Sequence, residues 1–436
     1  MSGDCQSNSQ IAGMHMPCYF SERDYLSVER QLQEVRACSE PPTILHRQPL
    51  RSLSHSFPAI SFYNDNNWTI REIPVKRREL IKALGVGAAA GVVASGAKAD
   101  DKKVYKWKMV TTWPKNFPGL GTGANYLAEL IGKMTNGQVQ VKVYGANELV
   151  GALEIFDAVS RGTAEMGHGA SYYWKGKSPA AQFFAAVPFG LNAQEMNSWL
   201  YHGGGMDLWK EVYAPFGLVP TAAGNTGVQM GGWFNKEINS VEDLKGLKMR
   251  IPGLGGEVIK RAGGTPVLLP GGEIFPSLQS GAIDATEWVG PYNDMAFGLH
   301  KAAKFYYYPG WHEPGTTLEC FINQKALEEL PKELQELVLN ASRIANQDML
   351  AELTAKNNSA LQELVEKNNV QLRRFPKDVM AELKRLSDEV VAEEAKLDPV
   401  TKKVYDSFVA FREQAIKWHA VSEQAYLNAR SPDTIG

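Results

Sequence analysis

The chain has 436 residues, of which 44% are apolar and 22% charged, and its formal net charge is −2 at pH 7. These values are typical of a soluble globular protein with two or three domains. A near-neutral charge without a long basic run argues against nucleic-acid binding, because contacts to phosphates need clustered lysine and arginine.

The stretch 75–99, "VKRRELIKALGVGAAAGVVASGAKA", indicates an export signal. The paired Arg77-Arg78 precedes a run of Ala, Gly, Val and Leu that ends in a small-residue cleavage pattern before Asp100. The pair resembles a twin-arginine signal, with Leu80 in place of the usual Phe. A transmembrane anchor is the alternative, but the run is shorter than the roughly 20 strongly apolar residues that a span needs.

Residues 1–74 precede this signal and have no clear periodicity. We interpret them as a misassigned or unstructured extension, with Val75 as the true initiator. Three of the four cysteines lie in this extension, so that Cys320 alone remains after the signal. We therefore expect no internal disulfide in the exported chain.

The exported part opens with strand and helix patterns in alternation. Residues 105–113 alternate apolar and charged side chains as a half-buried strand does, a helix follows to Gly137, 138–145 alternates again, and a helix is expected from about Leu149 to Arg161. This order predicts an α/β fold with a parallel or mixed sheet.

Two stretches of the chain resemble each other. "EIFDAVSRGTAEM" at 154–166 and "EIFPSLQSGAIDA" at 273–285 share Glu-Ile-Phe, a Gly six positions after the Phe and an acid three after the Gly. Both predict a helix, a glycine cap and a strand, and both lead into aromatic residues. We interpret them as matching parts of two α/β lobes.

Three polar residues of the second lobe fall at or near strand ends. "TGVQMGGWFN" and "GLKMRIPG" read as strands and carry Gln229 and Arg250, and Glu287 ends the strand of "IDATEWVG". Ligands of open α/β sheets lie beyond the carboxyl ends of strands, so the three predict a binding site. Taken alone, each residue also has a non-functional interpretation. Gln229 is then a surface amide, Arg250 a solvated charge and Glu287 the salt-bridge partner of Arg250.

Enzyme motifs occur only as fragments. "GLGTGA" at 119–124 is separated from its strand by prolines, and "HGGG" from His202 has no Gly-x-Ser-x-Gly partner and reads as a helix-capping loop. The scattered histidines His168, His202 and His312 are assigned to packing or loop hydrogen bonds. No catalytic residue is predicted.

Six motifs give the chain from about Val104 to Arg430 a family resemblance: "TTWP" at 111, "GASYYW" at 169, "GVQMGGWF" at 227, "KMRIPGLGGEV" at 248, "PGGEIFPSLQSGAIDATEWVGPYND" at 270 and "GWHEPG" at 310. It resembles the extracytoplasmic solute-binding proteins of TRAP (tripartite ATP-independent periplasmic) transporters, in the subgroup that binds 2-oxo and 2-hydroxy monocarboxylates.

The resemblance implies a role for each site residue. Arg250 would grip the substrate carboxylate, because its planar fork makes two charge-assisted hydrogen bonds. Gln229, Glu287 and the backbone carbonyl of Trp288 would hold Na⁺ or Ca²⁺ bridged to the substrate, since hard cations take oxygen ligands. Glu313 would accept from a 2-hydroxyl or orient Arg250.

Three consecutive aromatic residues complete the expected site. Tyr172, Tyr173 and Trp174 would wall the acyl tail, with core packing as the alternative.

The resemblance also implies the organisation of the chain. We expect a two-lobe periplasmic binding protein of type II-like fold with long C-terminal helices, which delivers pyruvate, lactate or a longer 2-oxo acid to a membrane permease. A periplasmic enzyme and a sensor subunit are the alternatives. The expected parts are the extension 1–74, the signal 75–99, lobe 1 at 100–224 with a return near 316–345, lobe 2 at 225–315 and a helical region at 346–436.

The last long helix, "DPVTKKVYDSFVAFREQAIKWHAVSEQAYLNAR", carries an apolar stripe of Val404, Phe408, Phe411, Ala415 and Trp418. Further apolar residues lie off the stripe, which predicts a homodimer through this helix, possibly exchanged between subunits. A helix that braces both lobes within one monomer is the alternative.

Overall fold

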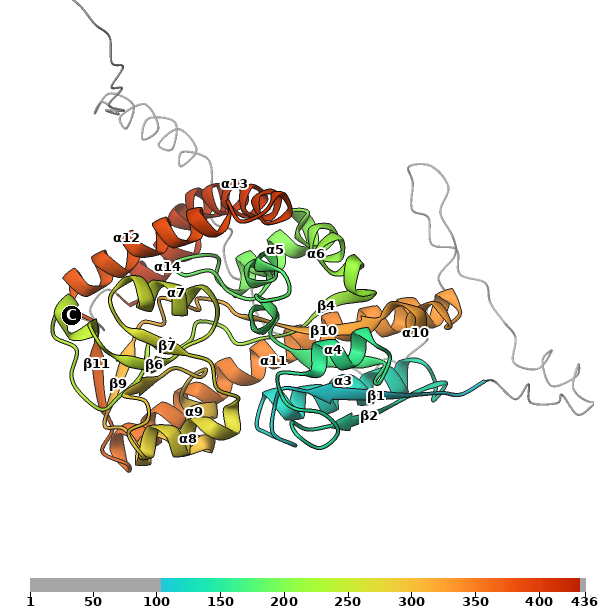
Figure 1. Ribbon diagram of the computed structural model, residues 1–436, viewed down its shortest axis with the longest axis horizontal. Helices are drawn as coiled ribbons and strands as arrows, with labels where there is room; N and C mark the ends of the chain where they lie inside the picture. The colour runs from blue at the N-terminus through green and yellow to red at the C-terminus, as the bar shows by residue number, and fades with distance from the viewer. Residues whose placement is uncertain (1–102, 432–436) are drawn as a thin grey trace, which may run out of the picture. The chain divides into compact units, whose positions relative to one another are not determined.

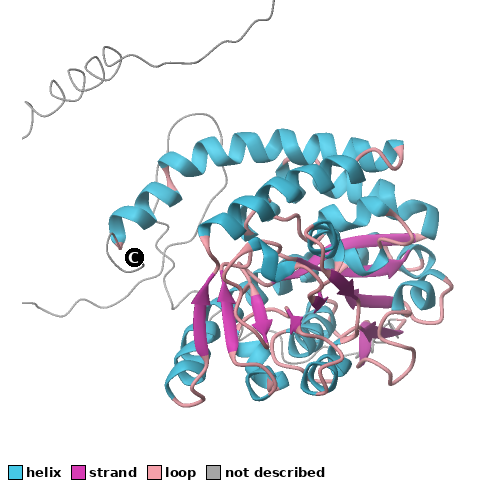
Figure 2. Cartoon of the chain, turned by 60° about the vertical axis from the view of Figure 1, so that its left-hand side comes forward, coloured by secondary structure: helices cyan, strands magenta, loops and turns pink. Residues whose placement is uncertain are grey.

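The computed structural model describes residues 103–431, and the expected extension and export signal lie outside the described residues. The strands of the described part form two mixed sheets, as the alternating sequence pattern predicts (Figures 1 and 2). We call each sheet with the helices packed on it a lobe. No helix among residues 103–431 is long and apolar enough to cross a membrane.

The first sheet has the order β2-β1-β3-β10-β4, with β1 parallel to β2 and β3 and with β10 antiparallel to β3 and β4. Its strands are β1 (Tyr105–Thr111), β2 (Val139–Tyr144), β3 (Met166–Gly169), β4 (Leu218–Asn225) and β10 (Thr317–Asn323).

The second sheet has the order β11-β9-β5-β8-β6-β7. Its strands are β5 (Gly232–Phe234), β6 (Lys248–Arg250), β7 (Thr265–Val267), β8 (Ala285–Thr286), β9 (Phe305–Tyr308) and β11 (Gln371–Arg374). β6 is parallel to both β7 and β8, so the carboxyl ends of these three strands share one edge. The region 346–436, expected as a helical region, also contains β11, which pairs with β9 and extends the second sheet.

The helices connect and cover the two sheets. The α-helices are α3 (Leu120–Met134), α4 (Ile155–Ser160), α5 (Ala193–His202), α6 (Gly205–Tyr213), α7 (Gly253–Arg261), α8 (Gly271–Gln279), α9 (Pro291–Phe297), α10 (Gln324–Glu328), α11 (Lys332–Glu366), α12 (Lys377–Glu394), α13 (Pro399–Val421) and α14 (Glu423–Arg430). Short 3₁₀ turns are η2 (Ser171–Trp174), η3 (Pro179–Phe184), η4 (Ala214–Phe216), η5 (Val241–Leu244) and η6 (Leu299–Lys301).

The two similar sequence stretches have similar structures. In the first, α4 is followed by Gly162 and then β3, and in the second, α8 is followed by Gly281 and then β8. Both glycines have positive φ, 78° and 75°, a conformation that glycine adopts without steric cost. The matched stretches therefore place two strand ends, Gly169 and Thr286, directly before the aromatic segments that the sequence analysis singled out.

Long helices join the two lobes. α11 packs on β4 and α3 near its start and on α9 further along, so it spans both lobes (Figure 1). α12 packs against α7 of the second lobe, and α13 packs against α5, α6 and η3 of the first. The helix that spans both lobes is therefore α11, whereas α13, for which the sequence analysis left a brace as the alternative to a dimer contact, packs on elements of the first lobe and on α12.

Candidate functional site

Two connections between the sheets carry buried polar residues. Residues 226–231 run from β4 to β5, and residues 309–316 run back from β9 to β10. Gln229 lies on the first connection and Glu313 on the second, and the backbone N–H of Gln229 donates to the Glu313 carbonyl at 3.1 Å. Gln229 was expected in a strand, and instead it lies in the segment where the chain changes sheets.

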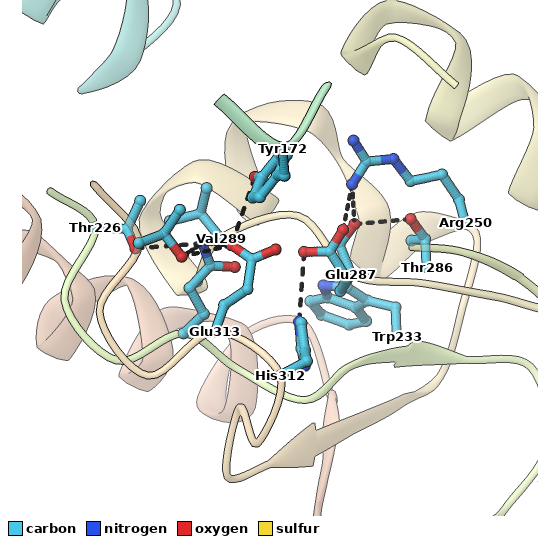
Figure 3. A network of polar contacts seen from close by, with 12 residues as sticks. Tyr172, Thr226, Trp233, Arg250, Thr286, Glu287, Val289, His312 and Glu313 are labelled. Atoms are coloured by element: carbon cyan, nitrogen blue, oxygen red, sulfur yellow. Dashed lines mark hydrogen bonds and ion pairs between the residues drawn. The ribbon is translucent and has the colours of Figure 1, made fainter. Parts of the chain in front are cut away.

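Arg250 and Glu287 meet because their strands are neighbours. Arg250 ends β6, its register partner Thr286 ends β8, and Glu287 follows Thr286 directly. The Arg250 guanidinium forms an ion pair with the Glu287 carboxylate and also donates to the Glu287 carbonyl at 3.2 Å (Figure 3). Both side chains are buried, so each charge depends on the other.

Gln229 and Glu313 form a second pair beside the first. The Gln229 amide donates to Glu313 Oε2 at 2.7 Å and lies 3.2 Å from the hydroxyls of Thr226 and Thr316. The Thr316 hydroxyl also donates to Glu313. Glu313 therefore orients the Gln229 amide and makes no hydrogen bond to Arg250, contrary to one of its two expected roles.

Two side-chain oxygens at this site have no hydrogen-bond donor within residues 103–431. They are the Gln229 amide oxygen Oε1 and the Glu287 oxygen Oε2, both buried. Glu287, His312 and Glu313 each offer a ligand atom, and these atoms lie within 4.8 Å of one another (Figure 3). Buried oxygens without donors, one of them anionic, match the ligands that Na⁺ and Ca²⁺ prefer.

The aromatic residues after β3 divide into two groups. The Tyr172 hydroxyl lies 3.5 Å from Glu313 Oε2, and the Tyr173 hydroxyl accepts from Arg250 Nη2 at 3.4 Å. Both tyrosines therefore reach from the first lobe to charged residues of the candidate site, Glu313 and Arg250. The indole of Trp288 packs against the Arg250 guanidinium, 5.2 Å from ring centre to Cζ.

Trp174 belongs to the core of the first lobe. Its ring lies 5.4 Å from that of Phe156, and its indole N–H donates to Glu319. Its ring makes an edge contact with the ring of Tyr173, and the two ring centres are 6.0 Å apart. Tyr172 and Tyr173 thus lie beside the candidate site, and Trp174 packs in the core, because consecutive residues of a 3₁₀ turn point in different directions.

Burial shifts the pKa values of the titratable groups at this site. It raises the pKa of Glu313 to about 7, and the nearby charge of Glu287 adds to the rise. It also raises the pKa of Glu287, which the charge of Arg250 opposes. The pKa of His312 falls to about 4 through burial, so His312 is neutral at pH 7 and offers a lone pair.

We expect cation binding at this site to release a proton near neutral pH. The raised pKa of Glu313 means that the cation-free protein holds a proton that a cation displaces, so cation affinity should increase as pH rises through about 7. Calorimetric Ca²⁺ titrations at pH 7 in two buffers of different ionisation enthalpy measure the released protons. Equal heats in both buffers and equal affinities at pH 6 and 8 contradict this expectation.

Sequence reasoning did not place His312 at the candidate site and assigned it to packing or loop hydrogen bonds. Its Nε2 lies 3.5 Å from Glu287 Oε2, and its ring is fully buried. The available signal was its position directly before Glu313 in "GWHEPG", a segment that had already been singled out.

Comparison with known families matches residues 109–397 to the bacterial extracellular solute-binding proteins, family 7. A monocarboxylate 2-oxoacid-binding periplasmic protein of Nostoc sp. is 46% identical over 363 residues, which cover 82% of this chain and 99% of the relative.

Solved structures of TRAP periplasmic solute-binding proteins are also similar to this chain. A TRAP periplasmic solute-binding protein from Pseudoalteromonas atlantica, with bound sodium and pyruvate, is 45% identical with a TM-score of 0.73, over 75% of this chain and 99% of that one. A second, from Colwellia psychrerythraea with bound calcium and pyruvate, is 46% identical with a TM-score of 0.73, over 75% and 100% of the two chains.

Proposed function

The chain belongs to family 7 of the bacterial extracellular solute-binding proteins, those of TRAP transporters, and from this we propose that it captures a small 2-oxo or 2-hydroxy monocarboxylate together with Na⁺ or Ca²⁺. One observation carries the proposal. A buried guanidinium and a buried carboxylate at the ends of β6 and β8 lie beside an amide oxygen of the β4–β5 connection that has no donor within residues 103–431.

Arg250 is the group that binds the substrate carboxylate. Its Nε and Nη1 are held by the Leu269 carbonyl and by Glu287, whereas the one hydrogen bond that Nη2 makes within residues 103–431 is to Tyr173 at 3.4 Å. Nη2 therefore has an N–H to donate. A carboxylate beside Nη2 gains a charge-assisted hydrogen bond and keeps Arg250 in its present position.

Gln229, Glu287 and the carbonyl of Trp288 are the groups that would hold the cation. The two unpaired oxygens, Gln229 Oε1 and Glu287 Oε2, fit this role, and neutral His312 adds a nitrogen beside Glu287. A bound cation would supply positive charge that attracts both the carboxylate and the 2-oxygen of a 2-oxo acid. Tyr172 and Tyr173 face the acyl tail in this arrangement.

Selectivity for the 2-oxygen tests the proposed function. We expect pyruvate to bind at least about tenfold more tightly than propionate, a difference of ~1.4 kcal/mol, because propionate has no oxygen for the cation. Calorimetry with both acids in the presence of Ca²⁺ measures the ratio. Equal affinities contradict the bridging arrangement, and no binding of any 2-oxo or 2-hydroxy acid contradicts the function.

Capture is followed by release to the membrane permease of the transporter rather than by reaction. The lobes contact each other through an ion pair of 2.7 Å between Lys175, directly after η2, and Glu257 of α7. Opening the lobes breaks such contacts, and a bound substrate stabilises the closed state that it contacts on both sides. A periplasmic enzyme is the alternative, and product formation from pyruvate by the purified protein would favour it.

Export by the twin-arginine route is part of the proposal. The family is extracellular, and the relative from Nostoc is periplasmic. The Arg77-Arg78 pair supports the route, and retention in the cytoplasm of a variant with both arginines changed to lysine tests it.

The C-terminal helices support a homodimer. Val404 and Phe408 of α13 are buried against the first lobe, whereas Trp418 is 64% and Val421 73% exposed. Trp418, which the sequence analysis placed on the same apolar stripe, is therefore exposed, because the second half of α13 extends past the lobe. Ile416, Tyr426 and Leu427 are also exposed, and a second copy of the chain would cover this apolar surface.

We expect Trp418→Glu to convert the dimer to a monomer at micromolar concentration. A charge in the centre of an apolar interface loses its solvation, whereas on a free surface it costs nothing. Light scattering measures the mass, and Leu149→Glu, at a 42% exposed position far from α13 in the sequence, is the matched control. A monomeric wild-type protein contradicts the dimer and leaves the binding site unaffected.

A further inference from the structure

Asp294 is a buried carboxylate near the candidate site with a full set of hydrogen-bond donors. It lies in α9, which follows the site segment 287–290. Its Oδ1 accepts from the backbone N–H groups of Val289 and Gly290, each at 3.1 Å. Its Oδ2 accepts from Trp233 Nε1 at 3.0 Å and from the Tyr306 hydroxyl at 2.7 Å. Although burial raises its pKa to about 6, Asp294 is ionised at pH 7.

The two oxygens of Asp294 connect different parts of the second lobe. Trp233 is on β5 and Tyr306 on the neighbouring β9, and their rings stack 4.0 Å apart at an interplanar angle of 17°. Both rings are fully buried, so they form a rigid support. Asp294 thereby ties the backbone after Glu287 to the middle of the sheet.

A fixed N–H also fixes the carbonyl of the same peptide. In a trans peptide the C=O points opposite to the N–H. The Val289–Gly290 peptide follows this rule: the Gly290 N–H donates to Asp294, and the Val289 carbonyl accepts from the Met230 N–H at 3.1 Å on the other side. In the preceding peptide the Val289 N–H also donates to Asp294, so the Trp288 carbonyl points away from Asp294.

The Trp288 carbonyl differs from its neighbours, which both accept hydrogen bonds from other described residues. The Glu287 carbonyl accepts from Arg250 and Thr286, and the Val289 carbonyl accepts from Met230. Within residues 103–431 no donor reaches the carbonyl between them. A buried carbonyl without a donor costs free energy unless a cation or a water satisfies it.

We infer that Asp294 is a positioning residue for the cation, which holds the Trp288 carbonyl in the direction that a cation ligand requires. The inference rests on the proposed function. The N–H groups of Val289 and Gly290 need only one oxygen of Asp294, Oδ1. The second oxygen, bound to two stacked rings, sets the position of these N–H groups relative to the sheet and therefore to Glu287.

Two variants separate this role from a merely structural one. Asp294→Ala releases the Val289 and Gly290 N–H groups, and we expect it to lower Ca²⁺ affinity at least tenfold in the presence of pyruvate. Tyr306→Phe removes one donor to Asp294 Oδ2 but keeps the Trp233 donor, the stacked ring and both backbone hydrogen bonds, so Asp294 stays tied to the sheet and Ca²⁺ affinity should change less than threefold. Thermal unfolding of both variants measures the loss of stability, which we expect in each.

The inference is overturned if Asp294→Ala binds Ca²⁺ within threefold of the wild type, or if Tyr306→Phe loses as much affinity as Asp294→Ala. Wild-type protein provides a check that needs no folded variant. In cation-free protein the Val289 and Gly290 amide hydrogens should be protected from exchange, and unprotected amides overturn the inference. Wild-type pyruvate binding without a cation requirement overturns the bridging function as well, which distinguishes the two failures.

Discussion

Replacing Arg250 with lysine is expected to weaken pyruvate binding by about 1.5 to 3 kcal/mol, which is roughly 10- to 150-fold. The buried guanidinium donates in three directions, to the Leu269 carbonyl, to Glu287 and to Tyr173. A lysine ammonium keeps the charge but lacks the planar fork, so it cannot serve these partners and a substrate carboxylate together.

Calorimetry of pyruvate binding measures this loss. The matched control is Arg261→Lys, the same change at a surface residue whose partners are Glu389 and Glu393. We expect the control to bind as the wild type does, because exposed ion pairs contribute little. Unchanged affinity of Arg250→Lys removes Arg250 from the binding site.

Replacing Glu287 with glutamine is expected to lower cation affinity at least about 100-fold, or ~2.7 kcal/mol, since the anionic ligand becomes neutral. Substrate and cation share ligands, so their affinities are linked, and pyruvate binding should weaken and lose its dependence on the cation. The change also leaves Arg250 buried without its counter-charge, and breaking such a pair costs about 3 to 5 kcal/mol of stability.

The two effects of Glu287→Gln are separable. A substrate carboxylate restores a negative charge beside Arg250, so pyruvate should raise the melting temperature of the variant even without a cation, whereas Ca²⁺ alone should not. Glu393→Gln, at an exposed partner of Arg261, is the control for a lost carboxylate. A variant with wild-type Ca²⁺ affinity contradicts the assignment of Glu287 as a cation ligand.

The sequence was informative where a site residue belongs to a regular strand pattern. Arg250 ends one strand and Glu287 follows another, and the apolar residues and glycine boundaries of these strands are visible in "KMRIPG" and "IDATEWVG". Parallel pairing brings such strand ends together. The repeat of helix, glycine and strand also predicted both Gly162 and Gly281 as turn positions, which their positive φ angles confirm.

Features that depend on long-range packing were not visible in the sequence. The hydrogen bond between Gln229 and Glu313 joins residues 84 positions apart on two irregular connections. The side-chain orientation of Trp174 depends on its tertiary neighbours, and so does the exposure of the last turns of α13. Local periodicity encodes neither. β11 was missed because four residues between two long helices carry too little pattern to identify a strand.

The joint binding of pyruvate and a cation is tested by calorimetry on the exported chain, from residue 100 onward. The protein is chelated and desalted, and pyruvate binding is then measured with and without Ca²⁺ or Na⁺. We predict tight one-to-one pyruvate binding with the cation present and a loss of at least about tenfold in affinity without it, because Gln229 Oε1 and Glu287 Oε2 have no hydrogen-bond donor in the described part of the chain. Pyruvate binding of equal affinity in both conditions would contradict this prediction.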